Sequence, residues 1–187
     1  MLNFLIRHSS RLSVRCGLIV LAIFLGSLIA GTQMPARFRG FTRALVEITV
    51  LKDGHGAALF LIIKQNLLVL GSEWAGFFTA GFTSILQVAW NGFQLGLLVR
   101  HYDFRTLTAL VLPHALLEFP ALLIGATISL WLVLKTIKDA MKCEFHLIQH
   151  LRRVIPFASL CVGLILLAAL IEVYLTPIIG AYTIGIR

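Results

Sequence analysis

Two long runs without a charged residue, Cys16–Met34 and Trp74–Val99, restrict the fold of this chain more than any other feature. A helix needs roughly 20 predominantly apolar residues to cross the hydrocarbon core of a bilayer. Inside lipid the backbone must satisfy its own hydrogen bonds, and a helix does so within one segment. Hydrophobic residues make up 59% of the 187 residues and charged residues only 13%, unlike a soluble domain. The chain is therefore an integral membrane protein.

We predict an all-α fold, a polytopic bundle of about five transmembrane helices that forms a single domain over residues 1–187. The length leaves no room for a separate soluble domain. Because several arginines precede the first span, we place the N-terminus on the cytoplasmic side and the C-terminus outside. The expected spans are Val14–Met34, Ala57–Gly71, Trp74–Val99, a broken element within Thr106–Lys138, and Val154–Tyr174.

The Ala57–Gly71 segment is short for a span and carries Lys64 near its middle. A lysine at the centre of a bilayer costs about 3 kcal/mol on insertion scales. Two interpretations stay open. Either Lys64 faces a polar interior, where Glu73 or Glu118 could pair with it, or the segment enters the membrane only partly.

Two amphipathic stretches lie between the spans. Residues 36–56 repeat aromatic and aliphatic side chains at helical spacing between arginines, which fits an interfacial helix or a packed surface helix. Gly54 and Gly56 favour a turn at its end. Lys135–Arg153 combines an apolar stripe with an excess of basic residues, so it is predicted as a second interfacial helix on the cytoplasmic side.

The net charge of +8 is spread over the flanks of the apolar segments rather than concentrated in one tract. This distribution is typical of topology signals and of contact with anionic headgroups. The lipid bilayer is therefore the predicted partner, and nucleic acid is not. Cys16, Cys143 and Cys161 are far apart and form no CxxC pair, so a disulfide scaffold is not expected.

Pro113 and Pro120 interrupt the fourth apolar segment. As one helix, this segment with its flanks would measure about 50 Å, whereas the hydrocarbon core is about 30 Å thick. Each proline also removes a backbone donor. We predict a half-helix at Thr106–Leu112, a turn bounded by the prolines, and a longer helix with Pro120 in its first turn.

Gly92 and Gly96 form a small-xxx-small pair, which predicts close contact with another helix. That helix can belong to the same chain or to a second copy in a homodimer. Gln87, Asn91 and Gln94 bring amides into the same span, and buried amides need hydrogen-bond partners. Hydrogen bonding between helices is the simplest interpretation of the three amides.

His114 and Glu118 lie four residues apart in the otherwise apolar "LVLPHALLEFPALLIG", which places them on one face of a helix. An ionisable residue inside a membrane segment is a functional hypothesis by default. Three interpretations stay open: the pair ties broken helix ends together, binds a substrate, proton or partner in a polar groove, or ligates a hydrolytic metal. The third is supported least, because a catalytic zinc usually takes three protein ligands and HExxH is absent.

Cys143, His146 and His150 share a helical face at positions i, i+3 and i+7. A zinc or copper site would fit this spacing, and so would the polar side of an amphipathic helix. No fourth ligand is evident in the sequence. We therefore predict neither a metal nor another cofactor.

Three segments that follow in order, "IIKQNLLV", "NGFQLG" and "LPHALLEFPALLIG", resemble the stage II sporulation protein M (SpoIIM) family of membrane proteins. The resemblance is strongest over Leu61–Trp131, within a core at about residues 57–138. Ala115 departs from the family pattern, which usually has glycine after the histidine. The positions that match the family motifs are Asn66, Asn91, Gly92, Gly96, Pro113, His114, Glu118, Pro120 and Ala121.

The resemblance implies a polytopic, non-enzymatic protein of a bacterial or archaeal cytoplasmic membrane. The family's namesake is similar to a scaffold that holds peptidoglycan hydrolases at the engulfing membrane of spore formers. Other relatives are similar to components found beside ABC-type ATPases. Because GxxxxGK[ST] is absent, an energised role needs an ATPase partner, for which Lys135–Arg153 is the natural docking surface.

We therefore expect a permease-like partner of an ABC-type ATPase or a scaffold for envelope remodelling. The alternative from a different class is an intramembrane metal-dependent hydrolase that uses His114 and Glu118. In either case the prolines and the glycine pair are expected to set helix breaks and packing. The expected polar core of the bundle consists of Lys64, Asn66, Asn91, His114 and Glu118.

Overall fold

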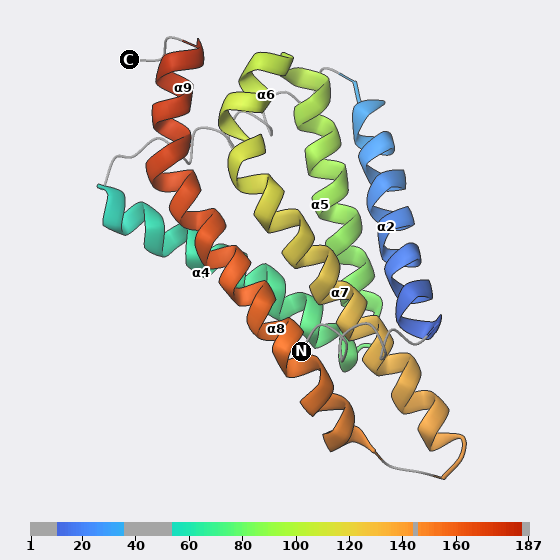
Figure 1. The fold of residues 1–187 in the computed structure, drawn as a ribbon. Helices are drawn as coiled ribbons and strands as arrows, with labels where there is room; N and C mark the ends of the chain where they lie inside the picture. The colour runs from blue at the N-terminus through green and yellow to red at the C-terminus, as the bar shows by residue number, and fades with distance from the viewer. Residues whose placement is uncertain (1–10, 36–53, 144–145, 185–187) are drawn as a thin grey trace.

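The structure, a computed structural model, describes residues 11–35, 54–143 and 146–184. Over these ranges the chain is helical and contains no strand, which confirms the predicted all-α fold. A 3-10 turn at Ala75–Phe77 and a π-helical turn at Ile171–Leu175 join some of the helices. The helices are α2 (Arg11–Thr32), α4 (His55–Trp74), α5 (Phe82–His101), α6 (Phe104–Leu110), α7 (Leu112–Ala140), α8 (Leu147–Leu170) and α9 (Thr176–Ile184) (Figure 1).

Five helical segments of the described chain are long and apolar enough to cross a membrane, as predicted. The chain is therefore a multi-pass membrane protein. The second segment has 23 residues, so Ala57–Gly71 belongs to a helix that is long enough to cross. The amphipathic helix predicted from residue 36 lies largely outside the described residues. The five segments are Leu12–Thr32, His55–Phe77, Phe82–His101, Leu112–Ala140 and Leu147–Thr183.

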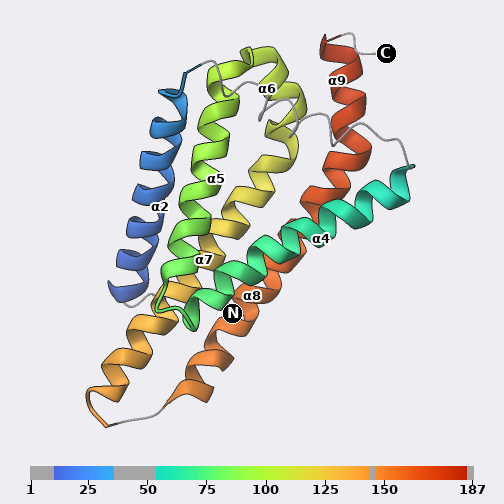
Figure 2. The ribbon, with the colours of Figure 1, turned by 180° about the vertical axis from the view of Figure 1, so that it is seen from behind.

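Helix α7 is central and contacts α2, α4, α5, α6 and α8. Helices α2 and α5 lie side by side, and α4 crosses obliquely next to α7 and α8, as Figure 1 and Figure 2 show from opposite sides. Helices α7 and α8 form a hairpin whose connected end projects beyond α2, α4 and α5. The apolar core has two parts, one between α2, α5 and α7 and the other between α4, α7 and α8.

The Gly92/Gly96 pair packs against α2 of the same chain. A methyl group on Gly96 would collide with the carbonyl oxygen of Leu28 and would lie 2.9 Å from the Cα of Gly31. A methyl group on Gly92 would lie 2.5 Å from the carbonyl oxygen of Phe24. The pair therefore brings two backbones together within one molecule, and this contact needs no second copy of the chain.

The predicted span Trp74–Val99 does not form as one helix. Helix α4 continues to Trp74, and the chain then reverses through the 3-10 turn before α5 begins at Phe82. Gly81, with φ of +91°, occupies the left-handed region that glycine adopts at no steric cost. Its N–H donates to the carbonyl oxygen of Gly76 at 2.7 Å and closes the turn. Gly76 and Gly81 therefore mark a chain reversal inside the segment that was predicted as one span.

The predicted break before the fourth long helix exists, but the prolines do not bound it. Helix α6 ends at Leu110, and α7 begins at Leu112 with Pro113 in its first turn, where the missing N–H costs no helical bond. Pro120 lies inside α7 instead of starting a helix. Pro120 is exposed, and the helix continues past it to Ala140.

Asp103 starts α6 as its N-cap residue. Its carboxylate accepts hydrogen bonds from the backbone N–H groups of Arg105 at 3.1 Å and Thr106 at 3.3 Å, and from the Thr106 hydroxyl at 2.5 Å. These bonds hold the pKa of Asp103 below its usual value, and the bond from the Thr106 side chain contributes most. The polar connector "RHYDFR" therefore supplies a helix cap.

Two expectations for the C-terminal third are corrected. Lys135–Arg153 is not one interfacial helix, because α7 ends at Ala140 and α8 begins at Leu147. The last span does not end at Tyr174, since α9 continues past Pro177 and Gly180 to Ile184. The π-helical turn directly before α9 lets the N–H of Thr176 bond the carbonyl oxygen of Ile171, five residues back, and the proline follows it in the first turn of α9.

Candidate functional site

His114 and Glu118 lie on one face in the first turns of α7, both largely withdrawn from the surface. They do not hydrogen-bond each other, and the Nδ1 atom of His114 is buried without a partner. Glu172, in the π-helical turn, lies close enough to Glu118 for the two carboxyl groups to interact electrostatically. The interior therefore holds two acids and a histidine where α7 meets the C-terminal helix.

A third acid, Glu73, lies in the last turn of α4. Its side chain is completely buried, and neither carboxylate oxygen has a hydrogen-bond partner. The indole Nε1 of Trp74 is also buried without a partner. Both groups lie beside Gly125 of α7, because a methyl group there would be 2.8 Å from Glu73 Oε2 and 3.5 Å from Trp74 Nε1.

Asn66 belongs to the same side of α4 as Glu73, since seven residues correspond to two helical turns. Its amide nitrogen is buried and has no partner. Glu118 and Gly125 are likewise seven residues apart on α7, about 10 Å along one face. We call the set Asn66, Glu73, His114, Glu118 and Glu172 the polar seam. It follows the contacts of α4 with α7 and with the π-helical turn.

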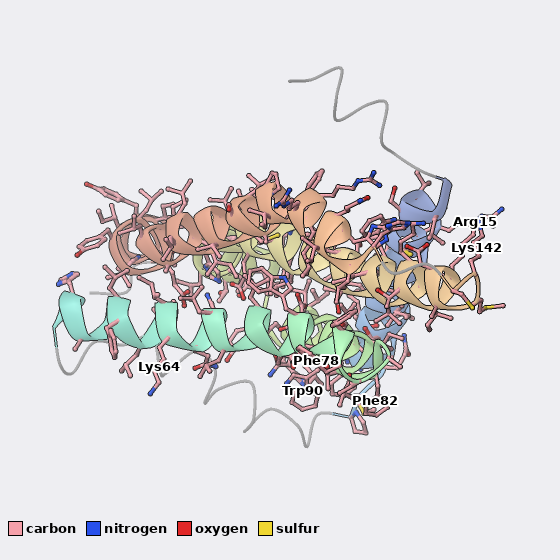
Figure 3. All side chains as sticks on the ribbon, turned by 90° about the horizontal axis from the view of Figure 1, so that it is seen from below. Arg15, Lys64, Phe78, Phe82, Trp90 and Lys142 are labelled. Atoms are coloured by element: carbon pink, nitrogen blue, oxygen red, sulfur yellow. The ribbon has the colours of Figure 1, made fainter. Side chains whose placement is uncertain are left out.

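Lys64 does not belong to the polar seam. Its side chain is exposed and points away from the bundle (Figure 3). In the part of the chain that the structure describes, it pairs with neither Glu73 nor Glu118. The long aliphatic stem lets its ammonium group reach toward the membrane interface, which reduces the cost of its position.

Asn91 also lies outside the polar seam. Its amide nitrogen donates to the carbonyl oxygen of Gln87 at 2.9 Å, so the amide is satisfied within α5. Of the predicted polar core, Asn66, His114 and Glu118 thus lie along the polar seam, while Lys64 and Asn91 have other surroundings. Sequence reasoning missed the importance of Glu73 and Glu172, although both are acids in apolar surroundings.

The three residues considered for a metal site do not converge. Cys143 is exposed in the turn after α7, and His146 precedes α8, whereas His150 is buried. His150 Nε2 lies 2.5 Å from Asp139 Oδ2, and Lys135 Nζ lies 2.7 Å from Asp139 Oδ1. No group of three metal-ligating side chains occurs among residues 11–35, 54–143 and 146–184.

The Lys135–Asp139–His150 triad instead fastens α7 to α8 near the projecting end of their hairpin. The ring of His150 also meets Trp131 edge-on, with ring centroids 5.6 Å apart. Beyond the triad the hairpin end is basic, and Figure 3 shows Lys142 there, at the same end of the bundle as Arg15. The exposed basic residues of the hairpin end are Lys138, Lys142, Arg152 and Arg153.

Comparison with known proteins gives one family and one relative. The family model described as stage II sporulation protein M matches residues 16–177. The chain is 32% identical over 128 residues to the uncharacterized protein MJ0793 of Methanocaldococcus jannaschii, in an alignment that covers 65% of this chain and 72% of that protein. No solved structure matches the chain.

Proposed function

We propose, because the chain belongs to the stage II sporulation protein M family, that it is a non-enzymatic membrane subunit of a multi-protein assembly. Within such an assembly, we assign it the role of permease-like partner to an ABC-type ATPase. The proposal places the chain in the cytoplasmic membrane of a bacterium or archaeon, with the start of α2 and the α7–α8 hairpin end on the cytoplasmic side.

The polar seam is the observation that favours a permease-like role over a purely structural scaffold. A buried polar group without a partner costs about 1–3 kcal/mol, so helices that only held other proteins would be more stable with apolar residues there. Transport folds place ionisable groups beside interrupted helices inside the membrane. Here His114 follows the α6–α7 break by three residues, and Glu172 lies within the π-helical turn.

The α7–α8 hairpin end supports contact with a soluble subunit. It projects beyond the other helices, its four exposed cations favour an acidic partner surface, and Met141 and Ile148 add exposed apolar contacts. The Lys135–Asp139–His150 triad keeps the two helix ends in a fixed relative position. A rigid basic projection of this kind can transmit a movement of the partner to α7 and therefore to the polar seam.

Affinity purification of the tagged chain from native membranes tests the proposal. We expect an ATPase subunit to co-purify, and the double variant Lys142→Glu/Arg152→Glu to lower its yield about tenfold, which corresponds to 1.4 kcal/mol. Arg105→Glu, an exposed charge reversal in α6 at the opposite end of the bundle, is the matched control and should leave the yield unchanged.

Three results would contradict the proposal in different ways. A chain that always emerges alone argues against an assembly. A peptidoglycan hydrolase in place of an ATPase supports the scaffold for envelope remodelling. Stoichiometric zinc that is lost in His114→Ala supports the intramembrane hydrolase. Size measurement of the purified chain also determines whether it forms a homodimer.

A further inference from the structure

Neither an ATPase partner nor the packing of the helices explains the buried carboxyl group of Glu73. Its carboxyl group has no exposed surface and no hydrogen bond, in a part of the chain that crosses the membrane. An isolated carboxylate is far more costly to bury than a neutral carboxylic acid, so such a group either neutralises itself or finds a counter-charge. No cation pairs with Glu73 among the described residues.

The groups that face Glu73 can be named helix by helix. Helix α5 contributes Ser84, whose hydroxyl donates to the backbone oxygen of Glu73 at 2.5 Å and not to its carboxyl group. Helix α7 contributes Gly125 and Ser129, neither of which titrates at ordinary pH. Helix α8 contributes the buried thiol of Cys161, which is close enough to interact electrostatically with the carboxyl group. A neutral thiol supplies no positive charge.

We propose that Glu73 is a proton-binding site, whose carboxyl group takes up and releases a proton inside the bundle in space that Gly125 keeps open. The O–H bond breaks when the proton leaves, and the negative charge stays on the carboxylate oxygens. The indole N–H of Trp74, which lies beside the same glycine and lacks an acceptor, donates to the carboxylate in that state. This site does not depend on whether the partner is an ATPase.

A proton fits the site better than a metal ion does. Calcium takes six to eight oxygen ligands, and magnesium six in near-octahedral geometry. Leu70 Cδ1 and Trp74 Nε1, which lie beside Gly125 together with the Glu73 carboxyl, offer no oxygen ligand, and the described residues contain no group of three metal-ligating side chains. One carboxyl with one nearby donor has the groups needed to hold and release a proton, and too few to replace the hydration shell of a hard cation.

The proton has a short route to water. Glu73 lies two residues before the 3-10 turn that begins the connection from α4 to α5, and the next residues of this connection, Phe78 and Thr79, are exposed. The buried carboxyl is therefore near one end of its helix, close to the level at which water becomes available.

Labelling with dicyclohexylcarbodiimide tests the site in the full chain, in detergent and in liposomes. A protonated carboxyl adds across one N=C bond of this apolar reagent, and the O-acylurea rearranges to a stable N-acylurea without a leaving group. We expect peptide mapping to find Glu73 modified at neutral pH and the modification to be lost in Glu73→Gln. In Gly125→Ala, labelling should be several-fold slower, because the added methyl fills the space beside the carboxyl oxygen.

Exposed Asp103 is the internal control, because it is ionised at neutral pH and should remain unmodified. The proposal is overturned if Glu73 stays unmodified in the folded chain from acidic to neutral pH. It is also overturned if a charged, water-soluble carbodiimide modifies Glu73 as fast as the apolar one, since the carboxyl would then be open to water.

A second measurement covers the case in which Glu73→Gln fails to fold. The double variant Glu118→Gln/Glu172→Gln keeps Glu73 while removing the two other acids of the polar seam. We expect its infrared spectrum at neutral pH to show a protonated-carboxyl C=O band that shifts in D2O, which demonstrates an exchangeable proton. Absence of this band in the folded double variant would contradict the proposal.

Discussion

Gly96→Ala is the substitution whose effect follows most directly from the packing of α2 against α5. The new methyl group would collide with the backbone oxygen of Leu28 and lie 2.9 Å from the Cα of Gly31, so no flexible side chain can move aside. Forcing one methyl into a packed core costs about 1–3 kcal/mol, and alanine in a helix returns up to about 1 kcal/mol. We expect a net loss of about 1–2 kcal/mol, which lowers the melting temperature by roughly 2–8 °C for a chain of this size.

The assay is thermal unfolding of the purified chain in detergent, with Gly26→Ala as the matched control. Gly26 belongs to α2, and a methyl group there would have no atom within 4 Å. The control should melt at the wild-type temperature or slightly above it. Oligomeric mass should be the same in all three proteins, because Gly96 is already covered within one chain. The packing argument is refuted if Gly96→Ala melts together with Gly26→Ala, or if its main effect is dissociation of a dimer.

Three further perturbations test other parts of the structure. Asp139→Ala leaves the buried ring of His150 without its hydrogen-bond acceptor, so the free energy of unfolding should fall by up to about 3–5 kcal/mol. Proteolysis between α7 and α8 should also accelerate. An unchanged cleavage rate argues against the triad. The cap bonds lower the pKa of Asp103, so their contribution to the stability of α6 is present above the ordinary Asp pKa and is lost as pH falls through the lowered value. Hydrogen exchange at the start of α6 should therefore accelerate in strong acid, and also in Asp103→Ala at neutral pH. Equal exchange rates in the variant and the wild type would exclude this cap. Exposed Cys143 should react with a water-soluble maleimide much faster than buried Cys161, and similar rates would show that the core packing is wrong.

The number of spans could be predicted from the sequence because it depends on length and on the absence of charge, which are local properties. Close helix packing at the glycine pair was also predictable, since such packing requires small residues whichever helix is the partner. The identity of that partner, α2, was not, because it depends on packing between segments more than 60 residues apart.

The errors arose where tertiary surroundings decide the outcome. A proline breaks a helix only if the lost bond and the ring clash cannot be accommodated. Pro120 lies at the surface and Pro177 follows a π-helical turn, so both helices continue. Glu73 fell between two predicted spans, Ala57–Gly71 and Trp74–Val99. Its burial depends on Gly125 of α7, which the sequence around Glu73 does not reveal.

An experimental density map of the chain in a lipid nanodisc, with a bound antibody fragment to add mass, tests the central claim directly. Our account predicts a helix that is interrupted at Val111, and carboxyl groups of Glu73, Glu118 and Glu172 enclosed among α4, α7 and the π-helical turn. A continuous helix from Phe104 to Ala140, with these acids facing bulk water or lipid, would contradict it.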